Sequence, residues 1–408
     1  MQDFLIDSMG AKGDGVAAGP LYAALTLPGE RVRAERQGDR AEVEAILEPS
    51  PDRVAPPCPY FGDCGGCALQ HWAQPPYLAW KADQLRQALA RERIETEILP
   101  TFVAPAHSRR RLALHARAAG KGVALGFKAR RSWRLVEIGS CTIAHPRLEA
   151  AFPALATLAK PFLEHPKSAP TLHVTLTETG LDVDVTGIER RSGGLSADAR
   201  VQAAERAAAG DFARVTLAGE IVYQARQPLV RLGRVVVGLP PGGFLQAVPE
   251  AEAAMAAFAV QALAGASRVA DLFCGVGTFS VRLAEVASVT AADVSAASIK
   301  ALIAASGAPG LKAITAEARD LARRPMLAAE MKRLDAVLFD PPRAGAAEQA
   351  REIAASKVPT AIGVSCDPAT FARDARILAD GGFTLRRVLP VDQFLWSPHV
   401  ELIGVFTR

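Results

Sequence analysis

The last third of the chain alternates short apolar runs with stretches of helical periodicity. The runs with the length of strands are residues 269–273, 289–293, 336–340, 360–365 and 400–406. Strands that alternate with helices along a chain are typical of a doubly wound sheet. We therefore predict an α/β domain here.

The first half shows the two-residue alternation of half-exposed strands. Residues 172–177 and 181–185 alternate strongly around a Glu-Thr-Gly turn, which predicts a β-hairpin. Residues 32–35 and 41–47 alternate in part and follow a glycine-rich stretch, so they fit either a small barrel of the oligonucleotide-binding kind or a β-meander. Residues 77–93 carry spaced leucines among charges and predict a helix.

Prolines and changes of pattern divide the chain into three predicted domains. A proline-rich stretch around residues 49–57 closes the first of them. We expect a small β-barrel over residues 1–52, a mixed α+β domain over 53–240 and the α/β sheet over 241–408.

Composition excludes some classes of protein. The chain has 408 residues, of which 50% are hydrophobic, so it can bury a large core and is not disordered. The N-terminus has no secretory pattern, and the most apolar stretch, residues 251–266, is too short to span a membrane. These observations predict a cytoplasmic protein with no membrane segment.

Positive charge is concentrated in one stretch, although the formal net charge is only +4. Residues 101–136 contain no Asp or Glu and nine basic residues. The nine are Arg109, Arg110, Arg111, Arg117, Lys121, Lys128, Arg130, Arg131 and Arg134. A stretch of one sign indicates a surface for the phosphate backbone of a nucleic acid, with a solvated sheet face as the alternative.

One cysteine stands where a ligand site is expected. Cys366 ends the apolar run at 360–365 and precedes Asp367-Pro368, at a transition from strand to helix. Ligands bind at the carboxyl ends of strands in such sheets, and a helix N-terminus favours the thiolate. The alternative is a buried thiol that serves as a small hydrophobic side chain.

Four other cysteines have the distribution of metal ligands. Cys58, Cys64 and Cys67 lie close together, and Cys141 follows at a distance. In a cytosolic chain such a set indicates four thiolates around zinc or an iron–sulfur cluster. Four unrelated free thiols are the alternative.

A glycine turn indicates a nucleoside site. Gly275 and Gly277 follow the strand at 269–273, and Asp293 ends the next strand, where it can bind ribose hydroxyls. The three-glycine dinucleotide fingerprint is absent, so S-adenosylmethionine fits better than NAD. Asp340, followed by Pro-Pro-Arg, lies at the end of a further strand and completes the predicted pocket.

Taken together, these motifs resemble the RNA uridine-C5 methyltransferases. The resemblance covers nearly the whole chain and includes Phe244-Leu245-Gln246, the glycine turn, the Asp-Pro-Pro-Arg and Ser-Cys-Asp-Pro motifs and His399-Val400-Glu401. It implies an N-terminal TRAM barrel, a central domain with a [4Fe-4S] cluster and a C-terminal Rossmann-like methyltransferase sheet. The cysteine spacing is similar to that of the branch that modifies 23S rRNA.

The resemblance also assigns roles to residues. Cys366 is the expected nucleophile and Glu401 the expected base. The residues expected to contact S-adenosylmethionine are Gln246, Phe273, Thr278, Asp293 and Asp340, and those expected to hold the cluster are Cys58, Cys64, Cys67 and Cys141. The chain departs from the family pattern, which often has Asn, at Val248, Thr278 and Asp367.

Three other functions remain open from the sequence. One is a cytosine-C5 methyltransferase, although such enzymes carry a cysteine in the motif corresponding to Asp340-Pro341-Pro342. Another is a tRNA uridine methyltransferase, and the third is a non-catalytic RNA-binding protein on the same scaffold. We expect a monomer that binds RNA, with 23S rRNA as the favoured target.

Overall fold

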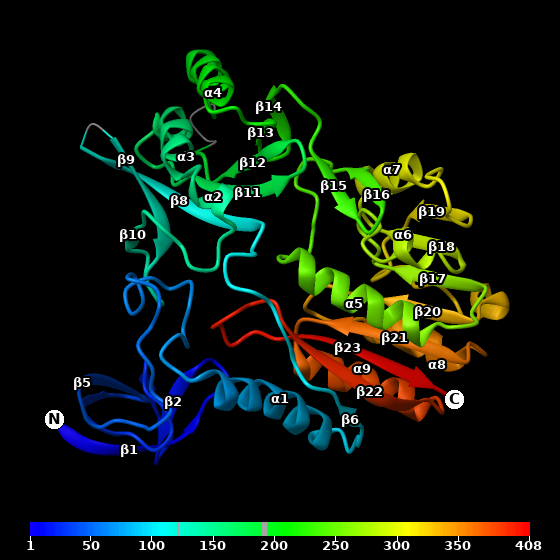
Figure 1. Cartoon of the computed structure of the whole chain (residues 1–408), viewed down its shortest axis with the longest axis horizontal. Coiled ribbons are helices and arrows are strands. Elements are labelled where there is room, and N and C mark those ends of the chain that lie inside the picture. Colours follow the sequence, from blue (N-terminus) through cyan, green and yellow to red (C-terminus); the bar gives the residue numbers. More distant parts are fainter. Residues whose placement is uncertain (121, 190–193) are drawn as a thin grey trace.

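The N-terminal strands close into a barrel at the lower left of Figure 1. The fold is taken from a computed structural model, which describes residues 1–120, 122–189 and 194–408. The strands, in the barrel order β1-β2-β3-β5-β4, are Gln2–Met9 (β1), Asp14–Ala17 (β2), Leu21–Ala24 (β3), Arg40–Glu48 (β5) and Arg31–Gln37 (β4). Ile6, Leu21 and Val32 are buried at its centre. The barrel prediction is confirmed, and the open meander is excluded.

The middle of the chain forms a seven-stranded sheet in the order β10-β9-β8-β11-β12-β13-β14. Its strands are Arg111–Ala119 (β8), Gly122–Lys128 (β9), Leu135–Glu137 (β10), Thr171–Thr177 (β11), Gly180–Thr186 (β12), Arg214–Leu217 (β13) and Glu220–Gln224 (β14). The helical segments beside it are Pro146–Glu149 (α2), Phe152–Ala159 (α3), Lys160–Leu163 (η1, a 3-10 turn) and Ala197–Ala209 (α4). The apolar sides of α3 and α4 share one core with the sheet. The predicted hairpin is confirmed as β11–β12.

The C-terminal part contains a nine-stranded sheet in the order β19-β18-β17-β20-β21-β23-β22-β6, with β7 also paired to β22. Its strands are Glu97–Ile98 (β6), Phe102–Val103 (β7), Arg268–Leu272 (β17), Ser288–Asp293 (β18), Ile314–Ala318 (β19), Ala336–Phe339 (β20), Thr360–Ser365 (β21), Thr384–Asp392 (β22) and Glu401–Thr407 (β23). Strands β17 to β21 are parallel, whereas β23 is antiparallel to both of its neighbours, β21 and β22.

Helices cover both faces of this sheet (Figure 1), and two large cores lie against it. The helical segments are Pro249–Ala262 (α5), Ser280–Leu283 (α6), Ala296–Ala305 (α7), Glu330–Arg333 (η2, a 3-10 turn), Ala347–Ala355 (α8) and Pro368–Asp380 (α9). A two-stranded ribbon, Leu229–Leu232 (β15) with Val235–Gly238 (β16), precedes α5. All five predicted apolar runs form strands, which confirms the α/β fold class.

Strand β22 is the longest of four strands in this sheet, with β6, β7 and β19, that the pattern of apolar residues did not predict. It contains Arg386, Arg387 and Pro390, so no apolar run marks it. Its backbone pairs with β23 on one side and with β6 and β7 on the other. Tertiary pairing therefore decides the conformation of β22 where local sequence does not.

The predicted helix at 77–93 is confirmed as Gln74–Arg91 (α1), and it packs on α9. With β6 and β7 it attaches a segment of the predicted central domain to the C-terminal sheet. The domain boundaries at residues 52 and 240 stay a prediction.

The side of α1 facing the sheet is anchored by a buried ion pair. Lys81 Nζ lies 2.5 Å from Asp392 Oδ1, and both side chains are fully buried. Lys81 also donates to the carbonyl of His399 at 2.6 Å, and the Tyr77 hydroxyl donates to Asp392 Oδ2 at 2.7 Å. These contacts fasten the loop between β22 and β23, residues 393–400, from one side.

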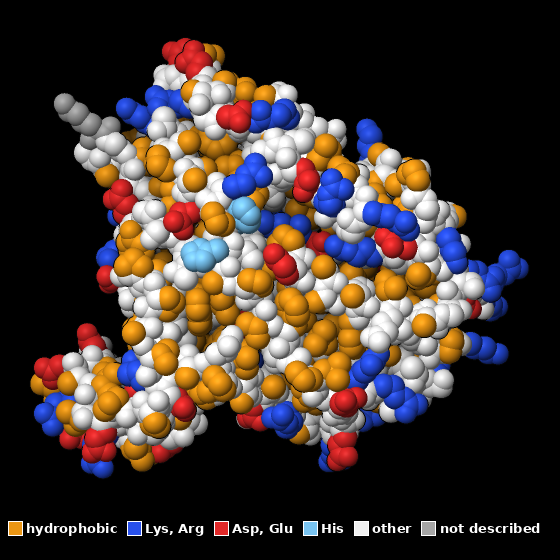
Figure 2. Space-filling model, in the orientation of Figure 1, with side chains coloured by type: hydrophobic (Ala, Val, Ile, Leu, Met, Phe, Trp, Pro, Cys, Tyr) orange, Lys and Arg blue, Asp and Glu red, His pale blue; other side chains and the backbone are white. Residues whose placement is uncertain are grey.

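The surface carries charges of both signs (Figure 2). In that view acidic and basic side chains are mixed over the barrel and the central sheet, and hydrophobic side chains gather across the middle of the face. Among the described residues, no helix is long and apolar enough to cross a membrane.

Candidate active site

Three of the predicted site residues stand side by side at the carboxyl ends of parallel strands. Leu272 pairs with Ala292 on one side and with Phe339 on the other. The next residues in register are Phe273, Asp293 and Asp340, which follow or end β17, β18 and β20. Neighbouring strands lie about 4.8 Å apart, so this row forms one rim of the sheet.

The glycine turn after β17 is tied to Asp293. Oδ2 of Asp293 accepts the backbone N–H of Gly275 at 3.0 Å, and Oδ1 accepts that of Ser295 at 2.8 Å. Each oxygen keeps further acceptor capacity, because an ionised carboxylate has about four lone-pair positions. Asp293 thus shapes the turn and can still accept from a ligand hydroxyl.

Three residues of this turn, Phe273, Gly275 and Gly277, have a backbone that favours glycine. Gly277 has φ +94°, and a Cβ there would lie 2.5 Å from Leu302 Cδ1. Phe273 has φ 63° although it carries a bulky side chain. Such strain costs about 1–3 kcal/mol and is concentrated at functional sites. Thr278, the remaining predicted contact in the turn, is buried.

Cys366 and Glu401 meet across two neighbouring strands. Ser365, the last residue of β21, pairs with Leu402 of β23 in antiparallel register. The next step of that register brings Cys366 beside Glu401. The predicted nucleophile and base, which are separated by more than thirty residues in sequence, are therefore adjacent in space.

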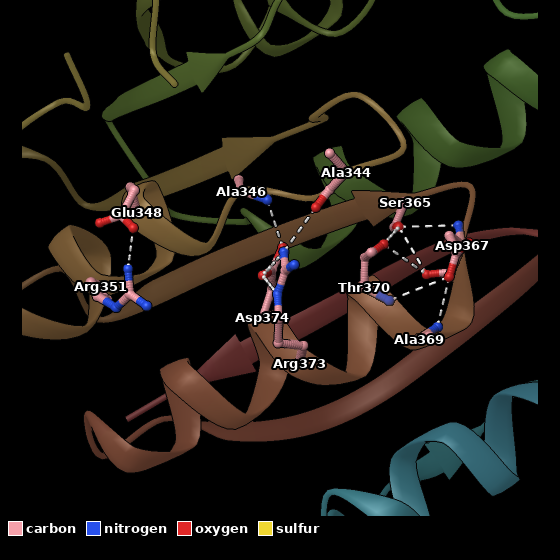
Figure 3. A network of polar contacts seen from close by, with 10 residues as sticks. All are labelled: Ala344, Ala346, Glu348, Arg351, Ser365, Asp367, Ala369, Thr370, Arg373 and Asp374. Atoms are coloured by element: carbon pink, nitrogen blue, oxygen red, sulfur yellow. Dashed lines mark hydrogen bonds and ion pairs between the residues drawn. The ribbon is translucent and has the colours of Figure 1, made fainter. Parts of the chain in front are cut away.

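The turn that presents Cys366 is held by side-chain hydrogen bonds, drawn in Figure 3. Asp367 caps α9: its Oδ1 accepts the backbone N–H groups of Ala369 at 2.9 Å and Thr370 at 3.3 Å. The Ser365 hydroxyl donates to the carbonyl of Asp367 at 3.1 Å. The sequence departure at Asp367 therefore keeps a helix cap, since Asp and Asn cap equally well.

The loop after Asp340 is fixed to the same helix. Asp374 of α9 accepts the backbone N–H of Ala346 at 2.8 Å, and Arg373 donates to the carbonyl of Ala344 at 3.0 Å (Figure 3). Arg343 also lies 3.5 Å from the carboxylate of Asp367. These contacts hold the Asp-Pro-Pro-Arg segment against the Cys366 turn.

Two buried amides connect the carboxylates of the site. Gln246 Nε2 donates to Asp340 Oδ2 at 3.3 Å, and Gln393 Nε2 donates to Glu401 Oε2 at 2.8 Å. Gln393 Nε2 also donates to Gln246 Oε1 at 2.7 Å, so the two amides are joined. Gln393 was missed in the sequence because nothing in its local pattern distinguishes it.

Burial shifts the proton affinities of these groups. It raises the pKa of Glu401 to about 7, while the hydrogen bond from Gln393 acts in the opposite direction. The pKa of Asp340 is raised well above its ordinary value, first by burial and second by the charge of Glu401. Glu401 is therefore poised to exchange a proton near neutral pH.

The pKa of the Cys366 thiol differs from what the sequence led us to expect. A helix N-terminus was expected to favour the thiolate, but burial, followed by the charges of Glu401 and Asp340, raises the pKa of Cys366 to about 11. The prediction of a lowered pKa is thus wrong for the ligand-free protein. Burial, followed by the two nearby carboxylates, outweighs the helix dipole, whose effect is about 0.3–1 kcal/mol.

The four cysteines that the sequence predicts as metal ligands lie around one cavity. Cys58, Cys64, Cys67 and Cys141 all line a cavity of about 180 Å³, together with Arg109. The backbone of Cys64 bridges to Ala129, just after β9, so the cysteine loop is attached to the central sheet.

The thiols of this cavity influence each other electrostatically. Burial, and to a smaller extent the charges of the neighbouring thiols, raises the pKa of Cys67 to about 12. Within the described ranges, no three His, Cys, Asp or Glu side chains are grouped tightly enough to hold a single metal ion. The four predicted cysteines thus line one cavity, but their side chains are not grouped around a single point.

Fewer basic side chains of residues 101–136 are available to bind phosphate than the sequence suggested. Arg110 is buried and pairs with Glu252, with Nη2 2.5 Å from Oε2. Arg130 and Arg131 both pair with Asp14 of the barrel. Lys121 lies outside the described residues. The expectation that the whole stretch binds phosphate is therefore corrected, because three of its charges are engaged in ion pairs with Glu252 and Asp14.

One aromatic side chain in this stretch is strongly exposed. Trp133, in the turn between β9 and β10, is 81% exposed, and Lys128 Nζ lies 3.9 Å from its ring centroid. A large exposed aromatic ring beside a cation is a common platform for nucleic-acid bases.

The fold and the paired thiol and carboxylate define the class of Rossmann-like methyltransferases. A sequence model described as tRNA (Uracil-5-)-methyltransferase matches residues 235–408. An uncharacterized RNA methyltransferase of Caulobacter vibrioides is 66% identical over 100% of both chains. The 23S rRNA (uracil(1939)-C(5))-methyltransferase RlmD of Chromohalobacter salexigens is 33% identical over 99% of this chain and 88% of its own length.

The similarity extends to a solved structure. The tRNA (uracil-54, C5)-methyltransferase of Pyrococcus abyssi, in complex with S-adenosyl-L-homocysteine, has 22% sequence identity and a TM-score of 0.76, over 100% of both chains. The chain belongs to the RNA uracil-C5 methyltransferase family.

Proposed function

We propose that the protein transfers a methyl group from S-adenosylmethionine to C5 of a uridine in RNA, through a covalent bond between Cys366 and C6. The observation that carries this proposal is the register that brings Cys366 beside Glu401 at the carboxyl rim of the sheet. A nucleophile and a base side by side are the two groups that this reaction requires.

The chemistry follows from the low reactivity of C5 in uracil. The thiolate of Cys366 bonds to C6 and leaves an electron pair on C5, as an enolate. C5 takes the methyl group from the sulfonium, which becomes a neutral thioether. Glu401 then removes the C5 proton, the electron pair of that C–H bond forms the C5–C6 double bond, and the thiolate leaves.

The cofactor is proposed to lie along the rim formed by Phe273, Asp293 and Asp340, with Gln246 and Thr278 beside it. Asp293 has acceptor capacity for ribose hydroxyls, and the glycine turn permits close approach of the ligand to the backbone. A sulfonium near Asp340 and Glu401 also adds a positive charge, which favours the Cys366 thiolate. This would offset the carboxylates that raise the pKa of that thiol in the ligand-free protein.

The proposed substrate is 23S rRNA, acted on in the cytoplasm by a monomer. The similarity to RlmD along nearly the whole chain supports ribosomal RNA over tRNA. The reaction is tested by incubating the purified protein and labelled S-adenosylmethionine with RNA from a strain that lacks the gene. Label in 5-methyluridine of 23S rRNA is expected; label in 5-methylcytidine or in tRNA would favour a rival function, and no label would reject catalysis.

We further propose that Cys58, Cys64, Cys67 and Cys141 hold a [4Fe-4S] cluster. Such a cluster takes one thiolate for each iron, and four thiols on the wall of one cavity suit that requirement. The cluster would cross-link the loop at residues 58–67 to Cys141, at the edge of the central sheet. Its proposed contribution is rigidity, and none of the steps above involves it.

Protein purified without oxygen is expected to be brown and to contain iron and sulfide in equal amounts. Replacing Cys67 by serine should lower the iron content and the melting temperature, because the cavity loses a ligand. A Cys274→Ser variant is the matched control, since that buried thiol is outside the cavity and should leave the iron content unchanged. A colourless protein with stoichiometric zinc would contradict the cluster.

The RNA surface is proposed to include Trp133 and Lys128. Trp133→Ala is expected to weaken RNA binding by about 1–3 kcal/mol, because a base loses its stacking partner. Lys128→Ala should reduce the salt dependence of binding by about one phosphate contact. Lys300, exposed on α7 at the other end of the molecule in Figure 1, provides the control charge. Equal effects of Lys128→Ala and Lys300→Ala in a salt titration would argue against this surface.

A further inference from the structure

The first residue after β22 is a glutamine whose hydrogen bonds are all made inside the protein. Gln393 is 2% exposed. Its Nε2 donates to Glu401 Oε2 and to Gln246 Oε1, and its Oε1 accepts the backbone N–H of Ala247 at 3.1 Å. A primary amide has two N–H bonds, and both are directed at acceptor oxygens.

The orientation of this amide is therefore fixed. If the amide were flipped, its oxygen would face the oxygens of Glu401 and Gln246, and its nitrogen would face the N–H of Ala247. Three contacts would become repulsive, so Gln393 can only donate to Glu401. A donor aimed at a carboxylate favours the ionised form of that carboxylate.

Gln393 is also the single hydrogen-bond donor to the Glu401 side chain within residues 1–120, 122–189 and 194–408. Burial disfavours the ionised form of Glu401, and Cys366 and Asp340 are the acidic groups whose own pKa values respond to its charge. The other titratable and charged groups on the elements packed against β23 and in the loop before it are Arg343 and Asp367 at the Cys366 turn, the Lys81–Asp392 pair, His399 in the loop and the Arg373–Asp374 pair on α9.

The loop that carries Gln393 is held at several points. Trp396, further along it, accepts backbone N–H bonds from Ala68 at 2.8 Å and Leu69 at 3.0 Å. The Tyr77 hydroxyl accepts the backbone N–H of Trp396 at 2.9 Å. Together with Lys81 on α1, these contacts hold both ends of the loop in place. They therefore fix the position of Gln393 relative to Glu401.

We propose that Gln393 is a positioning residue for proton removal, which orients the Glu401 carboxylate toward C5 of the bound uridine and keeps it a proton acceptor. The inference rests on the proposed function and deepens it. In the step concerned, the C5 proton passes to Glu401, the C–H electron pair forms the C5–C6 double bond, and the bond from Cys366 to C6 breaks. Gln393 touches neither the base nor the cofactor in this step and acts through Glu401.

The test compares Gln393→Met with the wild type in single-turnover reactions on the RNA described above. Methionine has a similar volume and cannot donate, so the Glu401 carboxylate loses the hydrogen bond that Gln393 donates to it. A hydrogen bond to a charged group is worth about 1.5–3 kcal/mol, so product release should slow by about 10- to 100-fold. The pH midpoint of release should also rise by about one unit.

A second substrate isolates the step. RNA that contains 5-fluorouridine forms the covalent adduct but has no C5 proton to lose, so adduct formation reports only the steps before Glu401 acts. Gln393→Met should form this adduct at the wild-type rate, which also shows that the variant is folded and binds both substrates. The control is Gln349→Met: Gln349 is 1% exposed and, in the part of the chain that the structure describes, its amide bonds to the backbone of Met326 and to no other group.

The outcomes separate the two proposals. Gln349→Met should lower the melting temperature and leave the pH profile of release unchanged. If Gln393→Met also leaves release and its pH midpoint unchanged, Gln393 has no positioning role, while the methyl transfer proposal stands. If the wild-type protein forms no adduct with fluorouridine RNA, the proposed function itself fails.

Discussion

Replacing Cys366 by alanine is expected to abolish methyl transfer, by about 10⁴-fold or more, because the variant lacks the thiol that forms the bond to C6. The thiol is half-buried at the end of β21, beside Glu401, and its removal leaves the cap of α9 intact. The measurement is transfer of labelled methyl from S-adenosylmethionine to RNA by the purified variant.

Binding should survive this substitution. Titrations of RNA and of S-adenosylmethionine should give affinities close to those of the wild type, since the side chain is small and Asp367 holds the turn. Cys366→Ser, which keeps the shape but is a far weaker nucleophile, should be as inactive as the alanine variant. Turnover by either variant above background would exclude covalent catalysis by Cys366.

Replacing Glu401 by glutamine is expected to trap the covalent enzyme–RNA adduct. The general base contributes about 10²–10⁴-fold to proton transfer, and without it the adduct forms but cannot decay by elimination. A band of protein joined to RNA should persist on a denaturing gel, dependent on S-adenosylmethionine and absent from the Cys366→Ala variant. If product forms at the normal rate and no adduct accumulates, another group removes the proton.

The same variant should be more stable than the wild type at alkaline pH. Burial raises the pKa of Glu401 from 4.5 to about 7, so the folded state binds its proton more tightly than the unfolded state. The wild type therefore loses stability as the pH rises between these values, by up to about 3 kcal/mol. Glutamine carries no charge and avoids this loss.

Thermal unfolding at two pH values measures this difference. The melting temperature of Glu401→Gln should exceed that of the wild type at pH 8, and the difference should shrink near pH 5, where Glu401 is neutral when folded. An equal difference at both pH values would mean that the ionised carboxylate is not the cause.

The sequence predicted the parallel strands well, because apolar runs such as residues 336–339 are buried along their whole length. It did not predict β22, whose charges and proline interrupt the apolar pattern. It also did not reveal that α1, β6 and β7 join the C-terminal sheet, since strands of two residues leave no periodic signal. Long-range pairing is not encoded in a local window of residues.

Some residues of the candidate site could likewise be predicted from the sequence, and others could not. Cys366 and Asp293 could be found because they follow or end a recognisable strand, whereas Glu401 was assigned through the family resemblance. Gln393 could not, because its importance depends on Glu401 and Gln246, which come from other elements. The raised pKa of Cys366 was also unforeseen, since it arises from burial of the thiol and from carboxylates that only the fold brings near.

The attachment of α1 to the C-terminal sheet limits how this enzyme can be divided into modules. A fragment cut at residue 240 would lose β6 and β7 and expose the edge of β22. It would also leave Asp392 without Lys81, and a buried charge deprived of its partner costs about 3–5 kcal/mol. The sheet that carries Cys366 and Glu401 is therefore not an independent module. A chimera that exchanges the RNA-binding parts must keep residues 74–103 together with this sheet.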